Sequence, residues 1–349
     1  MKKEKSCSIK TSIGGQALME GIMMRGPKRS AMAVRNPEGE MVIEEWDTKG
    51  TNRAKIFRLP IIRGVFGFAD SMISGYKCLM RSAEISGLEA LEEEEKKAKA
   101  AKKAEKAAKK AAKKGIELPE EPETAADEKG EEKKGSSAMT NIIMVVSVVL
   151  AIVLVVGLFF YLPSFLYKLL ADFIPEIYGN RYIQSIFEGI IRVALLVGYM
   201  ALVSLMKDIR RTFMYHGAEH KTIFCYEQGL ELTVENVRKQ KRFHPRCGTS
   251  FLIIMVLVGI LISFIIPPMD STIARVAIKI ALIPVIMGIG YELIKLAGKH
   301  DNWFIRIISA PGMWLQHITT LEPDDDMIEC AIAAMEKVIP DDGSDQIAQ

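Results

Sequence analysis

The stretch IIMVVSVVLAIVLVVGLFFYL, residues 142–162, decides the class of this chain. It contains no charged side chain, and it is long enough to cross the hydrocarbon core of a bilayer, which takes roughly 20 apolar residues. In lipid only a helix or a closed barrel satisfies its own backbone groups. The stretch therefore predicts a transmembrane helix. A second uncharged run, Gly248 to Met269, predicts another span that ends at Pro267 and Pro268, because proline cannot continue a helix.

Two further apolar segments, Ile186 to Met206 and Ile273 to Ala297, are long enough to span but carry charges. In the first, Glu188 and Arg192 lie four residues apart, so they can pair on one helical face. The charged residues of the second segment are Arg275, Lys279, Glu292 and Lys295. The first two lie near a helix end, from which long side chains can reach the interface. A helix buried in a soluble core is the alternative for both segments.

We expect a mainly α polytopic membrane protein with about four transmembrane helices in residues 140–300, since two spans alone would leave long apolar stretches without an apolar solvent. Positively charged loops stay in the cytoplasm, which sets the orientation. Residues 207–248 form a loop rich in Lys and Arg, whereas residues 163–185 hold only Lys168 and Arg181. Both termini are therefore predicted to face the cytoplasm.

Residues 1–88 predict a small N-terminal α+β cytoplasmic domain. Its segment SAMAVRNPEGEMVIEEW, residues 30–46, indicates two short strands around a turn at residues 36–39. The following segment, Ile56 to Ser82, is apolar but interrupted by proline, glycine and charged residues, which is typical of an interfacial helix. Residues 89–139 are rich in Lys, Glu and Ala without an apolar stripe, and they predict a charged helical or disordered linker.

The C-terminal part, residues 301–349, predicts an interfacial segment followed by a cytoplasmic helix. Trp303 to Thr319 mixes aromatic and polar residues and is expected to break at Pro311-Gly312. The short helix Met327 to Val338 follows three aspartates, which favour a helix N-terminus.

Composition excludes several classes of protein. The net charge of +3 averages two opposite extremes and indicates no nucleic-acid partner. The five cysteines are odd in number and scattered, so reduced thiols are expected instead of a disulfide framework. No apolar stretch follows the basic start of the chain, which predicts that no signal peptide is cleaved.

The segment HGAEH, residues 216–220, is the sharpest candidate for chemistry. In a helix, His216 and His220 lie on one face and can give two imidazole nitrogens to one divalent metal, expected to be zinc. This is the H-x-x-E-H order of inverted zinc peptidases. Glu219 would then be the general base. The alternative is that both histidines form only hydrogen bonds at the membrane interface.

A third protein ligand is required, and the sequence leaves three candidates open. Glu292 is one, although an ion pair with Lys295 or a partner near Arg275 is the alternative for it. His244 and Cys247, from the segment HPRC, are the others. The remaining histidines, His300 and His317, are expected to be polar surface residues, and Cys225 is expected to be packed.

Four stretches together resemble the bacterial DUF1385 (YqhQ-like) family: GGQALMEGIMMRGP at 14–27, YHGAEHK at 215–221, HPRCGTS at 244–250 and PGMWLQ at 311–316. The resemblance spans nearly everything except the charged linker. It implies a predicted metal-dependent protein of the bacterial cytoplasmic (inner) membrane, with His216, Glu219 and His220 at the motif positions. For the Gly- and Met-rich segment 14–27 we expect a tight turn and close backbone packing, because two glycines fall short of a phosphate-binding loop.

The candidate metal site and the predicted topology indicate two alternative functions. The first is a metal-dependent membrane hydrolase, for which a peptidase is one specific form, with its site at the cytoplasmic interface. The second is a non-enzymatic scaffold or accessory subunit of a membrane protein assembly, whose N-terminal domain and basic loop dock partners. In both, the lipid bilayer is the first partner.

Overall fold

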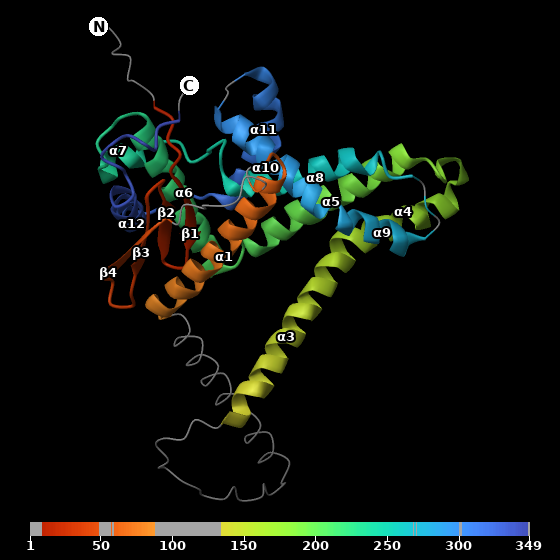
Figure 1. Ribbon diagram of the computed structural model, residues 1–349, viewed down its shortest axis with the longest axis horizontal. Helices are drawn as coiled ribbons and strands as arrows, with labels where there is room; N and C mark the ends of the chain where they lie inside the picture. The colour runs from red at the N-terminus through yellow and green to blue at the C-terminus, as the bar shows by residue number, and fades with distance from the viewer. Residues whose placement is uncertain are drawn as a thin grey trace, which may run out of the picture. The chain divides into compact units, whose positions relative to one another are not determined.

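The computed structural model describes residues 9–48, 57, 59–87, 134–267, 269, 271–299 and 302–347. The described chain is mainly helical, with one small antiparallel sheet (Figure 1). It divides into two units, one formed by residues 1–86 and 159–349 and the other by residues 87–158. The predicted linker falls outside the described residues up to position 133. The second unit contributes helix α3, Lys134–Val156, whose apolar side chains such as Leu150 are exposed.

The sheet confirms the predicted hairpin, β3–β4, and adds two more, β1–β2 and β2–β3. Its strands follow one another in the order β1 Gly14–Leu18, β2 Gly21–Arg25, β3 Arg29–Arg35 and β4 Met41–Asp47. The turn between β3 and β4 lies at residues 36–39, where the side chain of Asn36 accepts a hydrogen bond from the Glu40 amide at 2.8 Å. The Gly- and Met-rich segment thus forms the unpredicted β1–β2 hairpin, which agrees with the expected tight turn.

Side chains alternate between the two faces of the sheet along each strand, and helices cover both faces. Ile22 and Met24 face a core shared with α6, Lys207–Glu227, and α12, Asp325–Glu336. Met23 and Met32 face the opposite way, toward α1, Ile62–Ile85 (Figure 1). The predicted C-terminal helix is confirmed as α12, and it completes the core of the N-terminal sheet.

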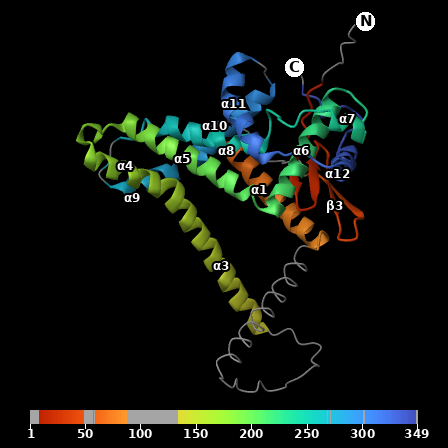
Figure 2. The same ribbon diagram turned by 180° about the vertical axis from the view of Figure 1, so that it is seen from behind.

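The remaining helices form an apolar bundle around α8. Their bounds are α4 Leu162–Phe173, α5 Arg181–Val203, α8 Gly248–Ser263, α9 Thr272–Ala281, α10 Ile283–Lys299 and α11 Trp303–Thr319. Short helical turns lie at Pro175–Ile177 (η3) and Val234–Arg238 (α7). Helix α8 packs against α5, α10 and α11, and α1 packs along α10 (Figure 2).

Among the described residues, two helices are long and apolar enough to cross a membrane, Val145–Phe173 and Arg181–Val203. A third results if α9 and α10 count as one span, and α8 is apolar but shorter. The first helix runs past the predicted end at Leu162, because a π-helical turn at Gly157–Tyr161 (η2) carries it into α4. The two or three apolar helices agree with a membrane protein.

The predicted span Ile273 to Ala297 is divided between two helices, which can count together as one bent span. The segment bends by 45° between α9 and α10, at Leu282. Pro284 explains the break, since proline lacks the amide that would continue the hydrogen-bond ladder and crowds the preceding turn. The predicted break at Pro311-Gly312 is wrong, because α11 continues through Pro311. Gly312 lets α11 lie directly on α8, where an added Cβ would come within 2.5 Å of Ser250.

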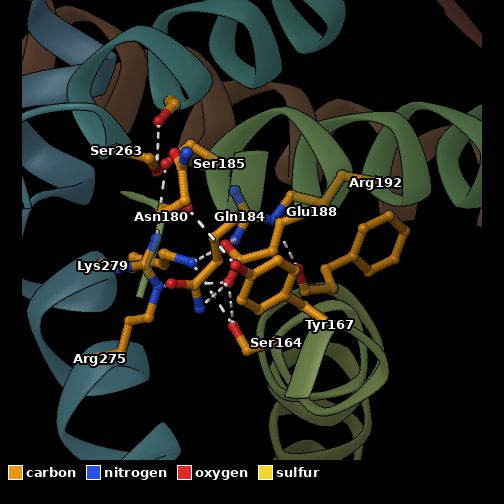
Figure 3. A network of polar contacts seen from close by, with 12 residues as sticks. Ser164, Tyr167, Asn180, Gln184, Ser185, Glu188, Arg192, Ser263, Arg275 and Lys279 are labelled. Atoms are coloured by element: carbon orange, nitrogen blue, oxygen red, sulfur yellow. Dashed lines mark hydrogen bonds and ion pairs between the residues drawn. The ribbon is translucent and has the colours of Figure 1, made fainter. Parts of the chain in front are cut away.

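Four charged side chains of the apolar helices α5 and α9 form one buried network around Glu188 (Figure 3). The predicted pair is confirmed, with Arg192 and Glu188 3.4 Å apart. The predicted reach of Arg275 and Lys279 to the interface is wrong, because their side chains are only 1% and 4% exposed and both pair with Glu188. A buried carboxylate without a counter-charge is costly, and these two cations compensate it.

Candidate metal centre

Helix α6 carries the two histidines, and the segment that follows α11 packs directly against this helix. Gly217 meets that segment directly: an added Cβ would lie 1.9 Å from the carbonyl oxygen of Leu321. The amide of Leu321 also donates to the carbonyl of Phe213 at 2.9 Å. Only glycine permits this approach. His216, Glu219 and His220 are all buried in α6, which confirms the helical placement of the motif.

Both imidazoles are oriented by backbone carbonyls. Nδ1 of His216 lies 2.8 Å from the carbonyl oxygen of Thr319, and Nδ1 of His220 lies 2.5 Å from that of Arg242. A carbonyl oxygen can only accept, so each Nδ1 carries the proton and each Nε2 presents a lone pair. Metal-binding histidines are held in this way. Nε2 of His220 is buried and has no hydrogen-bond partner among the described residues.

Cys247 supplies the third atom. Its Sγ lies 3.1 Å from Nε2 of His216 and 3.0 Å from Oγ1 of Thr249. The residue is also the N-cap of α8, and its sulfur accepts from the Thr249 amide at 3.4 Å. Burial works to raise the pKa of the thiol, but the neighbouring His220 and the Thr249 hydrogen bonds outweigh it, and the pKa is lowered. A thiolate is the form that binds metal.

The three ligand atoms of His216, His220 and Cys247 lie within 4.8 Å of one another, and all three residues are buried. We call this group the HHC cluster. Two imidazole nitrogens and one thiolate suit zinc better than magnesium or calcium, which prefer oxygen ligands. Burial lowers the pKa of His220, which keeps its imidazole in the neutral form that a metal requires. Three protein ligands leave a fourth position open, as in catalytic zinc sites.

Glu219 lies beside the HHC cluster but is not part of it. Its side chain packs on the backbone of β1, where an added Cβ at Gly15 would come within 2.8 Å of the Glu219 carboxyl carbon. The Gly15 amide donates to the carboxylate, which alone would lower its pKa. Burial dominates and raises the pKa of Glu219 to about 7. A carboxyl group that titrates near neutral pH can both accept and return a proton.

The structure does not bring the other two candidate ligands into the cluster. The His220 and His244 rings lie 5.6 Å apart, and Nε2 of His244 faces Glu227, 3.6 Å from its Oε2. Glu292 forms a two-point ion pair with Arg63 of α1, with 2.6 Å between Nε and Oε1. This partner differs from both partners considered from the sequence. His317 is exposed and Cys225 is packed, as predicted, and His300 lies outside the described residues.

Sequence reasoning missed the residues that hold the cluster in place. Gln316 of α11 is fully buried; its side chain accepts from the His244 amide and donates to the His244 carbonyl, each at 2.8 Å. It thereby fixes the turn that carries Cys247. The PGMWLQ and GGQ segments were the available signals, since both lie in the stretches that carry the family resemblance. Neither segment contains a metal ligand, and the sequence therefore indicated no role for them in the site.

Two cavities meet at Gly15 and Glu219. One, of about 480 Å³, is lined by Glu219, His220 and Cys247 together with Arg246 and Lys295. The other, of about 600 Å³, runs along α1 and is lined by His216, Glu219 and apolar side chains such as Phe68. Cluster residues therefore line both cavities, and a substrate could approach from either.

The comparisons with known proteins agree on a family. The sequence profile of a family described as "Protein of unknown function (DUF1385)" matches residues 59–341. The "Uncharacterized protein YqhQ" of Bacillus subtilis (strain 168) is 32% identical over 333 residues, which cover 95% of this chain and 93% of that protein. No solved structure matches. The HHC cluster and Glu219 fall within the matched range, whereas Gly15 precedes it.

Proposed function

This chain belongs to the DUF1385 family, as its motifs predicted, and we propose that it is a zinc-dependent membrane hydrolase. His216, His220 and Cys247 would hold the metal, and Glu219 would be the general base. One observation carries the proposal: two imidazole nitrogens and one cysteine sulfur lie within 4.8 Å of one another, and backbone carbonyls already orient both histidines.

A bound zinc ion would supply an acidified water and polarise a substrate carbonyl. Glu219 is placed to accept the proton of that water, since its carboxyl group is buried next to the cluster and its pKa is raised to about 7 by burial. The same group can then donate the proton to the leaving amine or alcohol. Hydrolysis of a peptide or other acyl bond is the reaction class that this arrangement favours.

We place the site at the cytoplasmic side of a four-span protein of the inner membrane, with both termini in the cytoplasm. The spans in this proposal are the helix Val145–Phe173, α5, α8 and the bent pair α9–α10. The basic loop of residues 207–248, which includes α6, supports this orientation. A membrane-protein substrate could then reach the cavity along α1, whose exposed Met72 and Tyr76 suit an apolar surrounding.

The test compares cells that express wild type, Glu219→Gln or Glu231→Gln as the sole copy. Glu231 is an exposed glutamate in the same loop and serves as the matched control. We expect new protein N-termini in membranes with wild type and Glu231→Gln that are absent with Glu219→Gln, although all three proteins bind the same amount of zinc. Identical termini in all three would contradict a peptidase. That outcome would favour the scaffold or accessory subunit.

A further inference from the structure

A second polar site lies in the helical bundle, away from the residues of the HHC cluster. Its centre is Glu188 of α5, whose side chain is completely buried. Three cations contact this carboxylate: Arg192 at 3.4 Å, Arg275 at 3.2 Å and Lys279 (Figure 3). Glu188 is the one carboxylate that contacts these cations within the part of the chain that the structure describes. The group therefore carries excess positive charge.

The guanidinium of Arg275 is incompletely satisfied. Its Nε binds Glu188, and its second amino nitrogen reaches the hydroxyl of Ser185 at 3.5 Å. The remaining nitrogen, Nη1, is buried and has no partner among the described residues, although the whole side chain is only 1% exposed. Leaving a charged donor buried without an acceptor is costly. An acceptor from outside the chain would remove that cost.

A small cavity adjoins this guanidinium. It has a volume of about 90 Å³, and polar and charged side chains line it: Ser164, Tyr167, Lys168, Gln184, Thr272 and Arg275. Thr272 is the first residue of α9, so the positive end of that ten-residue helix also points toward the cavity's rim. Lys168 is exposed, which gives the cavity a charged mouth.

We propose that this cavity binds a phosphate-type oxyanion. A planar guanidinium with free N–H groups matches two oxygens of such an anion. The volume of about 90 Å³ is smaller than the ~150 Å³ of a protein cavity that binds benzene, so it suits one tetrahedral oxyanion and is too small for a nucleotide or a sugar. The anion is either free phosphate or the phosphate of a lipid headgroup. This site does not depend on the proposed hydrolase, because it shares no residue with it.

The test uses the full chain in detergent, stripped of lipid, and measures thermal unfolding in inorganic phosphate against chloride at equal ionic strength. Lys168→Gln is the main variant because it removes an exposed charge and leaves the buried network intact. Lys241→Gln, at another exposed lysine, is the control. Arg275→Gln is measured beside them, since it removes both a partner of Glu188 and the proposed anion contact.

We expect phosphate to raise the unfolding temperature of wild type and Lys241→Gln, with Lys168→Gln requiring about threefold more phosphate for the same shift. Native mass spectrometry of protein that has kept its lipids separates the two sources. One retained phospholipid per chain, reduced in Lys168→Gln and lost in Arg275→Gln, identifies the headgroup; phosphate stabilisation without a retained lipid identifies the free anion. If phosphate gives no stabilisation beyond chloride and no phospholipid is retained, the proposal is overturned.

Discussion

Nε2 of His216 and Sγ of Cys247 lie 3.1 Å apart, although 31 residues separate them in the chain. The first comes from the middle of α6 and the second from the N-cap of α8. Buried Gln316 and the carbonyl of Thr319 hold the two sides of this contact. Since both anchors belong to α11, the C-terminal part of the bundle assembles the HHC cluster.

Gly15→Ala is predicted to destabilise the protein through Glu219. The new methyl group would lie 2.8 Å from the Glu219 side chain and 2.9 Å from the carbonyl oxygen of Met23. We expect a loss of about 1–3 kcal/mol in the free energy of unfolding, which is typical of overpacking. Gly14→Ala is the control because nothing lies within 4 Å of its added Cβ. Chemical denaturation in detergent measures both.

A double-mutant cycle shows whether Glu219 is the cause. In a Glu219→Ala background the clash with the carboxyl group is gone and only that with Met23 remains. Gly15→Ala should therefore cost less there, by at least about 0.5 kcal/mol. Equal costs in the two backgrounds would mean that Gly15 does not position Glu219.

Gly217→Ala is predicted to weaken zinc binding without touching a ligand. Its Cβ would lie 1.9 Å from the Leu321 carbonyl oxygen, so the segment that follows α11 must move and take the Thr319 carbonyl away from His216. Loss of such an orienting contact lowers metal affinity roughly 10–100-fold. Gly198→Ala in α5 has nothing within 4 Å and should bind zinc like wild type. Competition with a zinc chelator measures both, and equal affinities would contradict the anchoring role.

The sequence predicted the parts of this protein that depend on local patterns. The β3–β4 hairpin follows from alternation around a turn at residues 36–39, and the position of His216 and His220 on one face follows from helical periodicity. The bend at Leu282 was also locally encoded, by Pro284, and was overlooked.

Long-range contacts were out of reach of such patterns. Glu292 carries the charge expected of a ligand within a span, but its partner is Arg63, which lies 229 residues earlier in the chain. The choice of Cys247 over His244 depends on Gln316, 72 residues beyond His244. Spacing rules describe one helix or one turn at a time. They therefore identify the candidate third ligands but do not show which of them lies beside His216 and His220.

Metal-free protein is predicted to lose stability as the pH rises from about 5 to 7. Burial raises the pKa of Glu219 to about 7, above its ordinary value of 4.5. Between these values the folded state keeps a proton that the unfolded state releases, so unfolding becomes more favourable with rising pH. The full contribution is about 3 kcal/mol. Glu219→Gln cannot titrate, and the difference between the two proteins in a chelating buffer isolates this carboxyl group. Parallel pH profiles would contradict the assignment.

The proposed orientation predicts which side of the membrane each turn occupies. A reporter enzyme that works only outside the cytoplasm should be active when inserted after Gly179, in the turn between α4 and α5, and inactive when fused to the C-terminus. Lys and Arg are sparse in the first of these regions and abundant in the loop of residues 207–248. The reverse pattern would place the HHC cluster on the opposite face of the membrane.

The metal content of the purified full-length protein tests the central claim most directly. Mass spectrometry of wild type, Cys247→Ser and Cys225→Ser should find one zinc per chain in wild type and in Cys225→Ser, whose buried thiol donates a hydrogen bond to the Glu231 carbonyl. In Cys247→Ser the zinc affinity should fall by at least roughly 100-fold, because a ligand is lost and not merely an orienting contact. A wild-type protein without zinc after zinc loading, or equal zinc in Cys247→Ser, would contradict the assignment of the HHC cluster as a metal centre.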